Sequence, residues 1–269
     1  MRQPILGIFS WGVWSRFPAP WQFVFSRLTA RLCELGISRF FIWPYAILNY
    51  VDYVGYMLQF SPESGASQYS SFQDFFTRKL KQARTMQADH VWPCDGLLCE
   101  TGRVSELGPV NVKGRQHSVN AIFGRGFNIP QQSFFANVFL HNSDYHRIHA
   151  PVMGEIVNIV RIPGELRFLR PWLYKQPSLP AFTNERINVE ISAKAPSGKT
   201  QSWFLSIVGG PGVATIELDE AVKVGSTVQV GQELALFRLG STCCMVSPVM
   251  IDSYPGTKVL MGDLLNIGR

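Results

Sequence analysis

The sequence predicts an α+β fold in which N-terminal helices precede a mainly β body. Apolar residues recur at helical spacing in the first 60 residues, whereas beyond Val91 the chain consists of short alternating runs separated by glycine and proline. With 46% apolar residues among 269, the chain can bury a sizeable core. We expect a helical region over 1–60, a connector with a short helix over 61–90, and a β-rich body over 91–269.

Two helices are expected in the first region, over residues 21–35 and 44–58. The first stops at Gly36, and the second has Pro44 in its first turn. The region is rich in tryptophan, tyrosine and arginine and poor in acidic residues. Tryptophan and tyrosine favour the bilayer interface, and arginine can reach lipid phosphates. The pattern therefore predicts a membrane-associating region. The alternative is a helical cap that packs its aromatic side chains on the body.

The connector contains Pro62 and Gly65, which mark a boundary. Ser71 is a suitable N-cap for a short helix over residues 72–80. This helix would place Phe72, Phe75 and Phe76 on one face.

Two segments of the β body resemble the pattern of a lipoyl or biotinyl barrel-sandwich, in which a strand turns at glycine and returns. They cover residues 150–166 and 224–234. Neither contains the M-K-M or D-K-A hairpin whose lysine carries the prosthetic group. The sequence thus predicts a shared scaffold without the carrier function, since a fold alone does not determine function.

Charge and cysteine content limit the partners and the compartment. The net charge of +6 and the pI of about 9.2 favour an anionic partner, but lysine and arginine are scattered, which argues against nucleic acid. Five cysteines without a CxxC pair indicate neither a disulfide framework nor a zinc site. The apolar run at 40–48 is shorter than the ~20 residues of a membrane-spanning helix, and the N-terminus is unlike a signal peptide. We expect a cytosolic chain that touches a membrane, and a homo-oligomer is compatible with the sequence.

A Gly-Ser pair follows the predicted strand at residues 235–239. The Ser241 hydroxyl can approach the carbonyl of Gly240, which has no side chain to hinder it. Attack would convert the peptide bond into an ester. Elimination across Ser241 would then release the upstream chain and leave a dehydroalanine that hydrolyses to a pyruvoyl group. The alternative is an ordinary strand that ends in a Gly-Ser turn.

Several motifs around this stretch resemble those of the phosphatidylserine decarboxylases, pyruvoyl enzymes that make phosphatidylethanolamine. The resemblance runs from about Tyr69 to Thr242. In chain order the motifs are Phe72–Arg78 (F-x-x-F-F-x-R), Pro93–Gly96 (P-x-D-G), Lys113-Gly114 with Ser118 (K-G-x-x-Y-S), Asp144–Pro151 (D-Y-H-R-x-H-x-P), Asn184–Arg186 (N-E-R) and Leu239–Thr242 (L-G-S-T). This chain has His117 where the family usually has tyrosine, and Cys243-Cys244-Met245 where it generally has aliphatic residues.

The resemblance implies the reaction and its residues. It implies cleavage between Gly240 and Ser241 into chains 1–240 and 241–269, with Asp95, His149 and Ser241 as the processing triad. A covalent pyruvate derived from Ser241 would form a Schiff base with phosphatidylserine, and His146 would return the proton to the substrate carbon. The substrate implies a peripheral position on the cytoplasmic side of the cell membrane.

The residues themselves leave the arrangement of the two histidines open. His146 and His149 would face opposite sides of an extended strand but could converge in a turn. A histidine pair at this spacing also suits a metal, but no third ligand motif lies nearby, and we expect no metal site. The ordinary pKa of an imidazole, near working pH, suits His146 as a proton donor.

Three other interpretations remain open. The chain could be a barrel-sandwich homologue that binds lipid or protein without processing, although the intact L-G-S-T segment, Asp95 and both histidines argue against it. It could be a pyruvoyl decarboxylase of a soluble amino acid, which the aromatic, basic N-terminus disfavours. A thiol nucleophile at Cys243 or Cys244 is the third.

Overall fold

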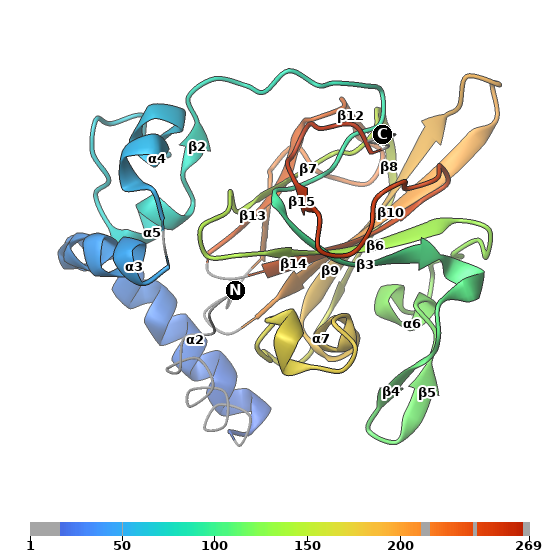
Figure 1. Cartoon of the computed structure of the whole chain (residues 1–269), viewed down its shortest axis with the longest axis horizontal. Coiled ribbons are helices and arrows are strands. Elements are labelled where there is room, and N and C mark those ends of the chain that lie inside the picture. The colour runs from blue at the N-terminus through green and yellow to red at the C-terminus, as the bar shows by residue number, and fades with distance from the viewer. Residues whose placement is uncertain (1–16, 50, 211–215, 239–240, 266–269) are drawn as a thin grey trace.

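The computed structural model describes residues 17–49, 51–210, 216–238 and 241–265. In these ranges a set of helices lies along one side of a mainly β body (Figure 1). This confirms the predicted α+β class and the order of helices before strands. Leu239 and Gly240, which include the upstream half of the predicted cleavage site, lie outside the described residues.

The first predicted helix is confirmed, and the second is wrong. α2 ends just before Gly36, but the single helix expected over 44–58 consists of two helices. The break arises because Asp52 caps a new helix, its carboxylate accepting the Gly55 N–H at 3.0 Å. The helical elements of this region are α2 (Ala19–Glu34), η1 (Gly36–Phe41), α3 (Ile42–Leu48), α4 (Tyr53–Gln59) and α5 (Phe72–Phe76).

Helix α5 begins as predicted and ends early. The Ser71 hydroxyl accepts the Asp74 N–H at 3.1 Å, which confirms the predicted cap. The helix ends at Phe76 instead of residue 80 because Lys79 and Leu80 pair with Phe60 and Ser61 as a strand, and Arg147 binds the free Thr77 and Arg78 carbonyls. The following residues form β2 (Lys79–Leu80), which pairs with β1 (Phe60–Ser61).

The β body consists of an antiparallel eight-stranded sheet and a smaller sheet that packs on it. The large sheet has the order β12-β8-β9-β10-β14-β6-β3-β15, and the small one β11-β13-β7. No sheet formed by the described residues closes into a barrel. The strands are β3 (Gly96–Arg103), β6 (Phe134–Leu140), β7 (Arg147–His149), β8 (Gly154–Ile162), β9 (Arg186–Lys194), β10 (Thr200–Gly209), β11 (Ile216–Leu218), β12 (Thr227–Val228), β13 (Glu233–Phe237), β14 (Ser241–Ser247) and β15 (Lys258–Val259).

Both faces of strand β14 are buried, because a core covers each side of the large sheet there. Cys243 packs in a core shared with the small sheet, which contributes Phe237. Cys244 faces a second core that contains Phe123 of α6 (Asn120–Phe123) and Ala181 of α7 (Leu179–Thr183). Cysteine behaves as a small apolar residue here, and the strand continues through both positions.

The two segments that resemble a barrel-sandwich lie side by side. β12 pairs with the start of β8 through Thr227 opposite Glu155 and Val228 opposite Gly154. The Gly231 N–H also donates to the Ala150 carbonyl at 2.8 Å. The similarity in sequence thus corresponds to two segments that hydrogen-bond to each other in an open sheet arrangement.

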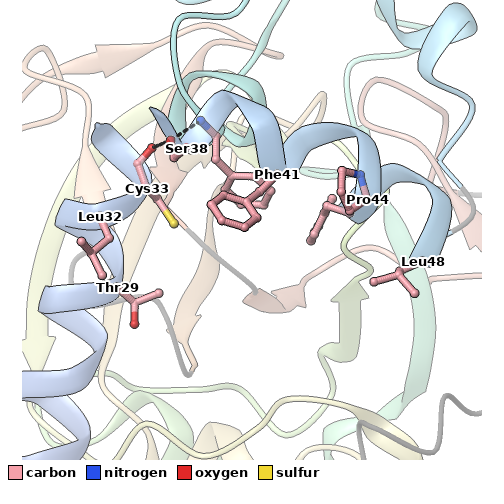
Figure 2. A pocket seen from close by; sticks show the side chains of 9 residues that line it. Thr29, Leu32, Cys33, Ser38, Phe41, Pro44 and Leu48 are labelled. Carbon is pink, nitrogen blue, oxygen red and sulfur yellow. Dashed lines mark hydrogen bonds between the residues drawn. The ribbon is translucent and has the colours of Figure 1, made fainter. Parts of the chain in front are cut away.

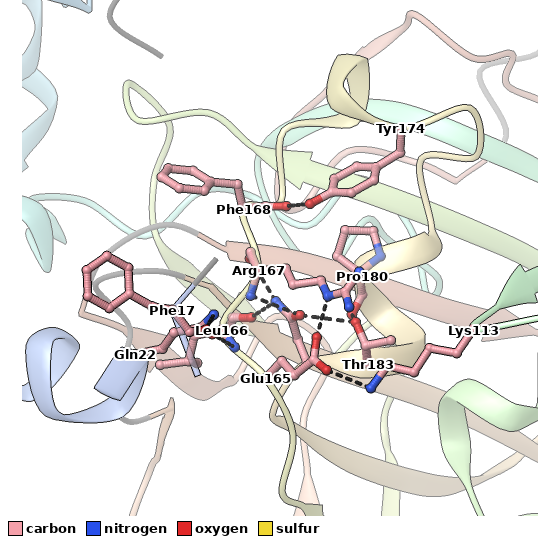
Figure 3. A network of polar contacts seen from close by, with 12 residues as sticks. Phe17, Gln22, Lys113, Glu165, Leu166, Arg167, Phe168, Tyr174, Pro180 and Thr183 are labelled. Carbon is pink, nitrogen blue, oxygen red and sulfur yellow. Dashed lines mark hydrogen bonds and ion pairs between the residues drawn. The ribbon is translucent and has the colours of Figure 1, made fainter. Parts of the chain in front are cut away.

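A polar network joins α2 to the loop that leads to α7 (Figure 3). The Gln22 side chain accepts the Leu166 N–H at 3.1 Å. Glu165 accepts a hydrogen bond from Lys113 at 2.9 Å and pairs with Arg167. Lys113 itself lies in the turn between β4 (Val110–Val112) and β5 (Arg115–His117). The helical region is therefore bonded directly to the β body.

Candidate active site

Ser241 begins β14 in the middle of the large sheet. Its backbone pairs with Gly209 of β10 on one side and with Leu140 of β6 on the other. Its side chain is fully buried, and the hydroxyl has no hydrogen-bond partner among the described residues. Buried polar groups are nearly always bonded, and Ser241 shares this lack of a partner with a few other buried hydroxyls in the described residues, Ser206 among them. Gly209 has no side chain to fill the space beside it.

Asp95 lies at the same end of this sheet. β3 and β14 are both antiparallel to β6, so they run in the same direction, and Asp95 precedes β3 as Ser241 begins β14. One intervening strand separates them by about 10 Å of backbone, at the usual strand spacing. The absence of a side chain at Gly96 lets β3 lie close to β6 here, because a Cβ at this position would lie 2.5 Å from a methyl of Val138. The topology thus places Asp95 and Ser241 at the same end of the sheet, on the two strands that flank β6.

The Asp95 carboxylate is engaged by groups that sequence reasoning missed. Arg84 donates to it through both terminal nitrogens, one at 3.0 Å, and the Met261 N–H donates at 2.8 Å. No hydrogen bond joins Asp95 to His149 in the described parts of the chain. Arg84 carried no local signal, because it lies in the irregular connector outside every motif.

His149 is held in the tautomer that a base requires. It lies in β7, and its backbone N–H donates to the carbonyl of Pro93, two residues before Asp95, at 2.8 Å. Its Nδ1 lies 2.8 Å from the Gly231 carbonyl and must carry a proton, because a carbonyl only accepts. Nε2 then has a free electron pair, which lies 3.2 Å from the Tyr145 hydroxyl. Burial lowers the pKa of His149 to about 4, although the Gly231 carbonyl and Asp95 oppose this.

His146 is also neutral and more deeply buried. Its Nδ1 lies 2.8 Å from the Asp144 carbonyl, and its ring centroid lies 4.1 Å from that of Phe76. Nε2 is therefore unprotonated and has no partner among the described residues. Burial, followed by the charge of Arg78, lowers the pKa of His146 well below its usual value. The expectation of a pKa near working pH is wrong, because the sequence does not reveal this burial.

His149 lies in β7 and His146 just before it, beside the segment that leads to the predicted cleavage site. β7 pairs with β13, and the Phe237 N–H donates to the His146 carbonyl at 3.0 Å. The imidazoles contact different neighbours, Phe76 for His146 and Tyr145 for His149. Within the described ranges no hydrogen bond joins the imidazoles to each other or to Ser241. The structure therefore gathers the four predicted residues into one region without a complete hydrogen-bonded triad.

Two buried arginines explain why the motifs occur together. Arg147 donates to the Thr77 carbonyl and forms an ion pair with Glu233. Arg78 donates to the Ser143 carbonyl at 3.2 Å and lies over the ring of Tyr56 at 4.3 Å. Arg147 thus binds the backbone that follows α5, and Arg78 binds the backbone that precedes β7. Together they fix α5 against β7.

The other nucleophile and the metal site that were considered gain no support. Burial raises the pKa of Cys244 well above its usual value, which keeps this thiol protonated. No cluster of three or more metal-ligating side chains occurs in the described ranges.

Comparison with known proteins identifies the family. The family model described as phosphatidylserine decarboxylase matches residues 72–266. The chain belongs to the phosphatidylserine decarboxylase family. Its matched segment includes Asp95, both histidines and Ser241. It confirms the family that the motifs indicated.

Individual relatives agree over most of the chain. The phosphatidylserine decarboxylase proenzyme of Verminephrobacter eiseniae is 32% identical over 199 residues, covering 67% of this chain and 70% of that protein. The proenzyme of Pseudoalteromonas atlantica is 31% identical over 229 residues, covering 74% and 78%. That of Glaesserella parasuis is 29% identical over 228 residues, covering 74% and 76%. The similarity therefore extends over two thirds or more of both partners in each pair.

Proposed function

We propose that the chain is a pyruvoyl-dependent phosphatidylserine decarboxylase, made as a proenzyme that cleaves itself between Gly240 and Ser241. The observation that carries the proposal is the buried, unpartnered Ser241 hydroxyl at the sheet end where Asp95 lies. A buried hydroxyl without a hydrogen bond is costly for stability, and reaction removes it.

The cleavage needs no reactant except water. The Ser241 oxygen attacks the Gly240 carbonyl carbon, the peptide C–N bond breaks, and the Ser241 nitrogen gains a proton. Elimination then takes the Cα proton of residue 241 and releases Gly240 as a carboxylate. Water converts the resulting dehydroalanine into a ketone and releases ammonia. The 1–240 chain and the 241–269 chain remain paired through β14, which has sheet partners on both sides.

His149 is the proposed base for the attack. Its Nε2 carries a free electron pair, and its pKa of about 4 keeps it neutral at physiological pH. Tyr145 occupies this position in the structure and must yield it to Ser241. Asp95 would stabilise the imidazolium that forms, since its charge already favours the protonated ring. Serine is a poor nucleophile without such a base.

The region around residue 241 suits a pyruvoyl group. The conversion turns the buried hydroxymethyl of residue 241 into a methyl and its nitrogen-bearing Cα into a ketone, so no unsatisfied hydroxyl remains. Such a group supplies a ketone that condenses with the substrate amine and accepts the electrons released when carbon dioxide leaves. His146 can exchange a proton at Nε2, which has no partner in the described structure.

His146→Ala should therefore separate the two reactions. We expect normal self-cleavage but a loss of decarboxylation on the order of 10²-fold to 10⁴-fold, because a general acid or base is removed. The low pKa of His146 implies that it acts as a neutral ring that first takes up a proton. Cleavage is followed on denaturing gels and carbon dioxide release on the cleaved protein. Full activity in the cleaved variant would contradict the role.

Exposed apolar side chains on the N-terminal helices support the proposed peripheral position on a membrane. The proposed substrate and the net charge of +6 are the basis for proposing its anionic, cytoplasmic side. The residues of α2 that face the protein include Gln22 and Ser26, whereas Trp21 and Leu28 are 57% and 52% exposed. None of the helices in the described residues meets the length and apolarity needed to cross a bilayer. The exposed apolar side chains of the region, which we call the apolar face, are Trp21, Val24, Phe25, Leu28, Leu32, Leu35, Ile37, Phe40, Phe41, Trp43, Ile47, Leu48, Val54 and Leu58.

The same helices also surround a hollow. A pocket of about 380 Å³ lies between α2 and α3, with Leu32, Phe41 and Leu48 among its lining residues. Figure 2 shows these side chains around the opening. This many exposed large apolar side chains on the N-terminal helices suit contact with the acyl region of a bilayer.

Polar substitutions on the apolar face should weaken vesicle binding. We expect the combined substitutions Ile37→Gln, Phe40→Gln and Ile47→Gln to reduce co-sedimentation with phosphatidylserine vesicles at least tenfold. Each removes an exposed apolar side chain that would be buried in the bilayer on binding. High salt should release the wild type only partly, because salt screens the arginines but not the apolar contact.

The matched control carries three similar substitutions on the β body, at Val224, Met250 and Tyr254, which are also exposed. Binding as strong as wild type is expected for the control. Equal binding by both triple variants would mean that the helices are a structural cap.

Substrate assays test the proposed activity against its alternatives. Phosphatidylserine in vesicles should yield phosphatidylethanolamine, whereas free serine should be decarboxylated far more slowly. An uncut protein that binds vesicles would support the non-processing homologue. A cut protein that prefers a free amino acid would support the soluble decarboxylase.

A further inference from the structure

Arg238, two residues before Gly240, is held by three separate elements. Its guanidinium donates to Glu217 of β11 at 2.7 Å and forms an ion pair with Glu34 at the end of α2. Its carbonyl accepts a hydrogen bond of 2.9 Å from the Gln73 side chain of α5. We call these three contacts the Arg238 clamp. Both the side chain and the backbone of this residue are therefore fixed.

The other side of the predicted scissile bond is fixed as well. Ser241 pairs with Gly209 and Leu140 from its first position in β14. Only Leu239 and Gly240 connect Arg238 to this strand. The reach of a two-residue connection is small, so the separation of its two described ends matters. The positions of the two ends therefore govern how closely the Ser241 hydroxyl can approach the Gly240 carbonyl.

Gln73 is an unusual residue to find buried here. It is 7% exposed, and its side-chain oxygen has no hydrogen-bond partner among the described residues. An apolar residue would avoid that unsatisfied oxygen, so the fold retains the amide against a cost. The contact that this amide does make is the one to the Arg238 carbonyl.

We propose that Gln73 is a positioning residue for self-cleavage, which acts by holding the Arg238 backbone that leads to the proposed scissile bond. It does not touch the reacting atoms. Misplacing reacting groups by about 1 Å can cost on the order of 10²-fold in rate. The inference rests on the proposed self-cleavage and adds a control on its rate. After cleavage the bond that the clamp aligns no longer exists, so decarboxylation should not need it.

Gln73→Glu is the variant that tests this most sharply. It keeps the size and shape of the side chain but replaces the donating amide by a carboxylate, which repels the Arg238 carbonyl. We expect the half-time of self-cleavage to lengthen at least tenfold. Once cleavage is complete, the turnover of phosphatidylserine per mole of the 241–269 chain should equal that of wild type. A merely structural defect would lower both quantities.

The control is Gln176→Glu. Gln176 also donates its side-chain amide to a backbone carbonyl, that of Pro109 at 3.1 Å, in a part of the fold away from β14. It should process at the wild-type rate. Melting curves of all variants show whether the fold is intact.

A second variant covers the case in which Gln73→Glu folds poorly. Arg238→Gln removes the contacts to Glu217 and Glu34, and it should slow cleavage in the same direction. In the double variant the slowing of self-cleavage should be smaller than the product of the two single-variant factors, because both substitutions release the same segment.

The outcomes separate this inference from the proposed function. Wild-type cleavage rates in both folded variants would overturn the role of the clamp and leave self-cleavage standing. Equal losses in cleavage and in turnover per cleaved chain would also overturn it. A wild-type protein that never cleaves would overturn both proposals.

Discussion

Ser241→Ala should give an uncut chain without decarboxylase activity. The substitution removes the only atom proposed to attack Gly240, and no other hydroxyl begins β14. The fold should tolerate it, because β14 is held by backbone pairs and the removed oxygen has no hydrogen bond within the described structure. Denaturing gels and an assay for carbon dioxide release measure both losses.

Ser206→Ala is the matched control for this substitution. Ser206 lies in the neighbouring strand β10, is equally buried, and also has an unpartnered hydroxyl among the described residues. It pairs with Cys244 and so faces the opposite side of the sheet from Ser241. We expect this variant to cleave and turn over as wild type does. Cleavage of Ser241→Ala at the same place would refute the role of Ser241.

His149→Ala should stop self-cleavage or slow it on the order of 10²-fold to 10⁴-fold, because the attack loses its base. His90→Ala, which removes a histidine stacked on Trp203, should leave the rate unchanged. The time course of cleavage on denaturing gels measures both.

The pH dependence of wild-type cleavage tests the same role. His149 accepts a proton only while its ring is neutral, that is, above its pKa of about 4. Cleavage should therefore persist as the pH falls through 6.5, the ordinary histidine value, and decline only as it nears 4. A rate that already halves near pH 6.5 would point to an exposed histidine instead.

Local patterns predicted the elements that depend on neighbouring residues. The helix before Gly36 and the Ser71 cap follow from spacing and capping chemistry. Errors arose where distant residues decided the outcome. α5 ends at Phe76 because Lys79 and Leu80 pair as a strand with Phe60 and Ser61, and Arg147, far along the chain, binds the Thr77 and Arg78 carbonyls. The break at Asp52 had a local capping signal that helical spacing obscured.

The site shows the same division. Motifs indicated Asp95, His146, His149 and Ser241, and the topology brings these segments to one region. Their protonation states were not predictable from the sequence, because burial by Phe76 and the charge of Arg78 act on His146 only after folding. The hydrogen bonds from Tyr145 to His149 and from Arg84 to Asp95 likewise form only in the folded chain.

Intact-mass spectrometry of the purified wild-type chain under denaturing conditions tests the central claim most directly. The account predicts two masses, those of residues 1–240 and of residues 241–269 with a pyruvoyl group in place of Ser241. Treatment with borohydride should add two hydrogens to the small chain alone. A single mass for the whole 269-residue chain after prolonged incubation at neutral pH would contradict the account. A small chain that begins with an unmodified serine would contradict it as well.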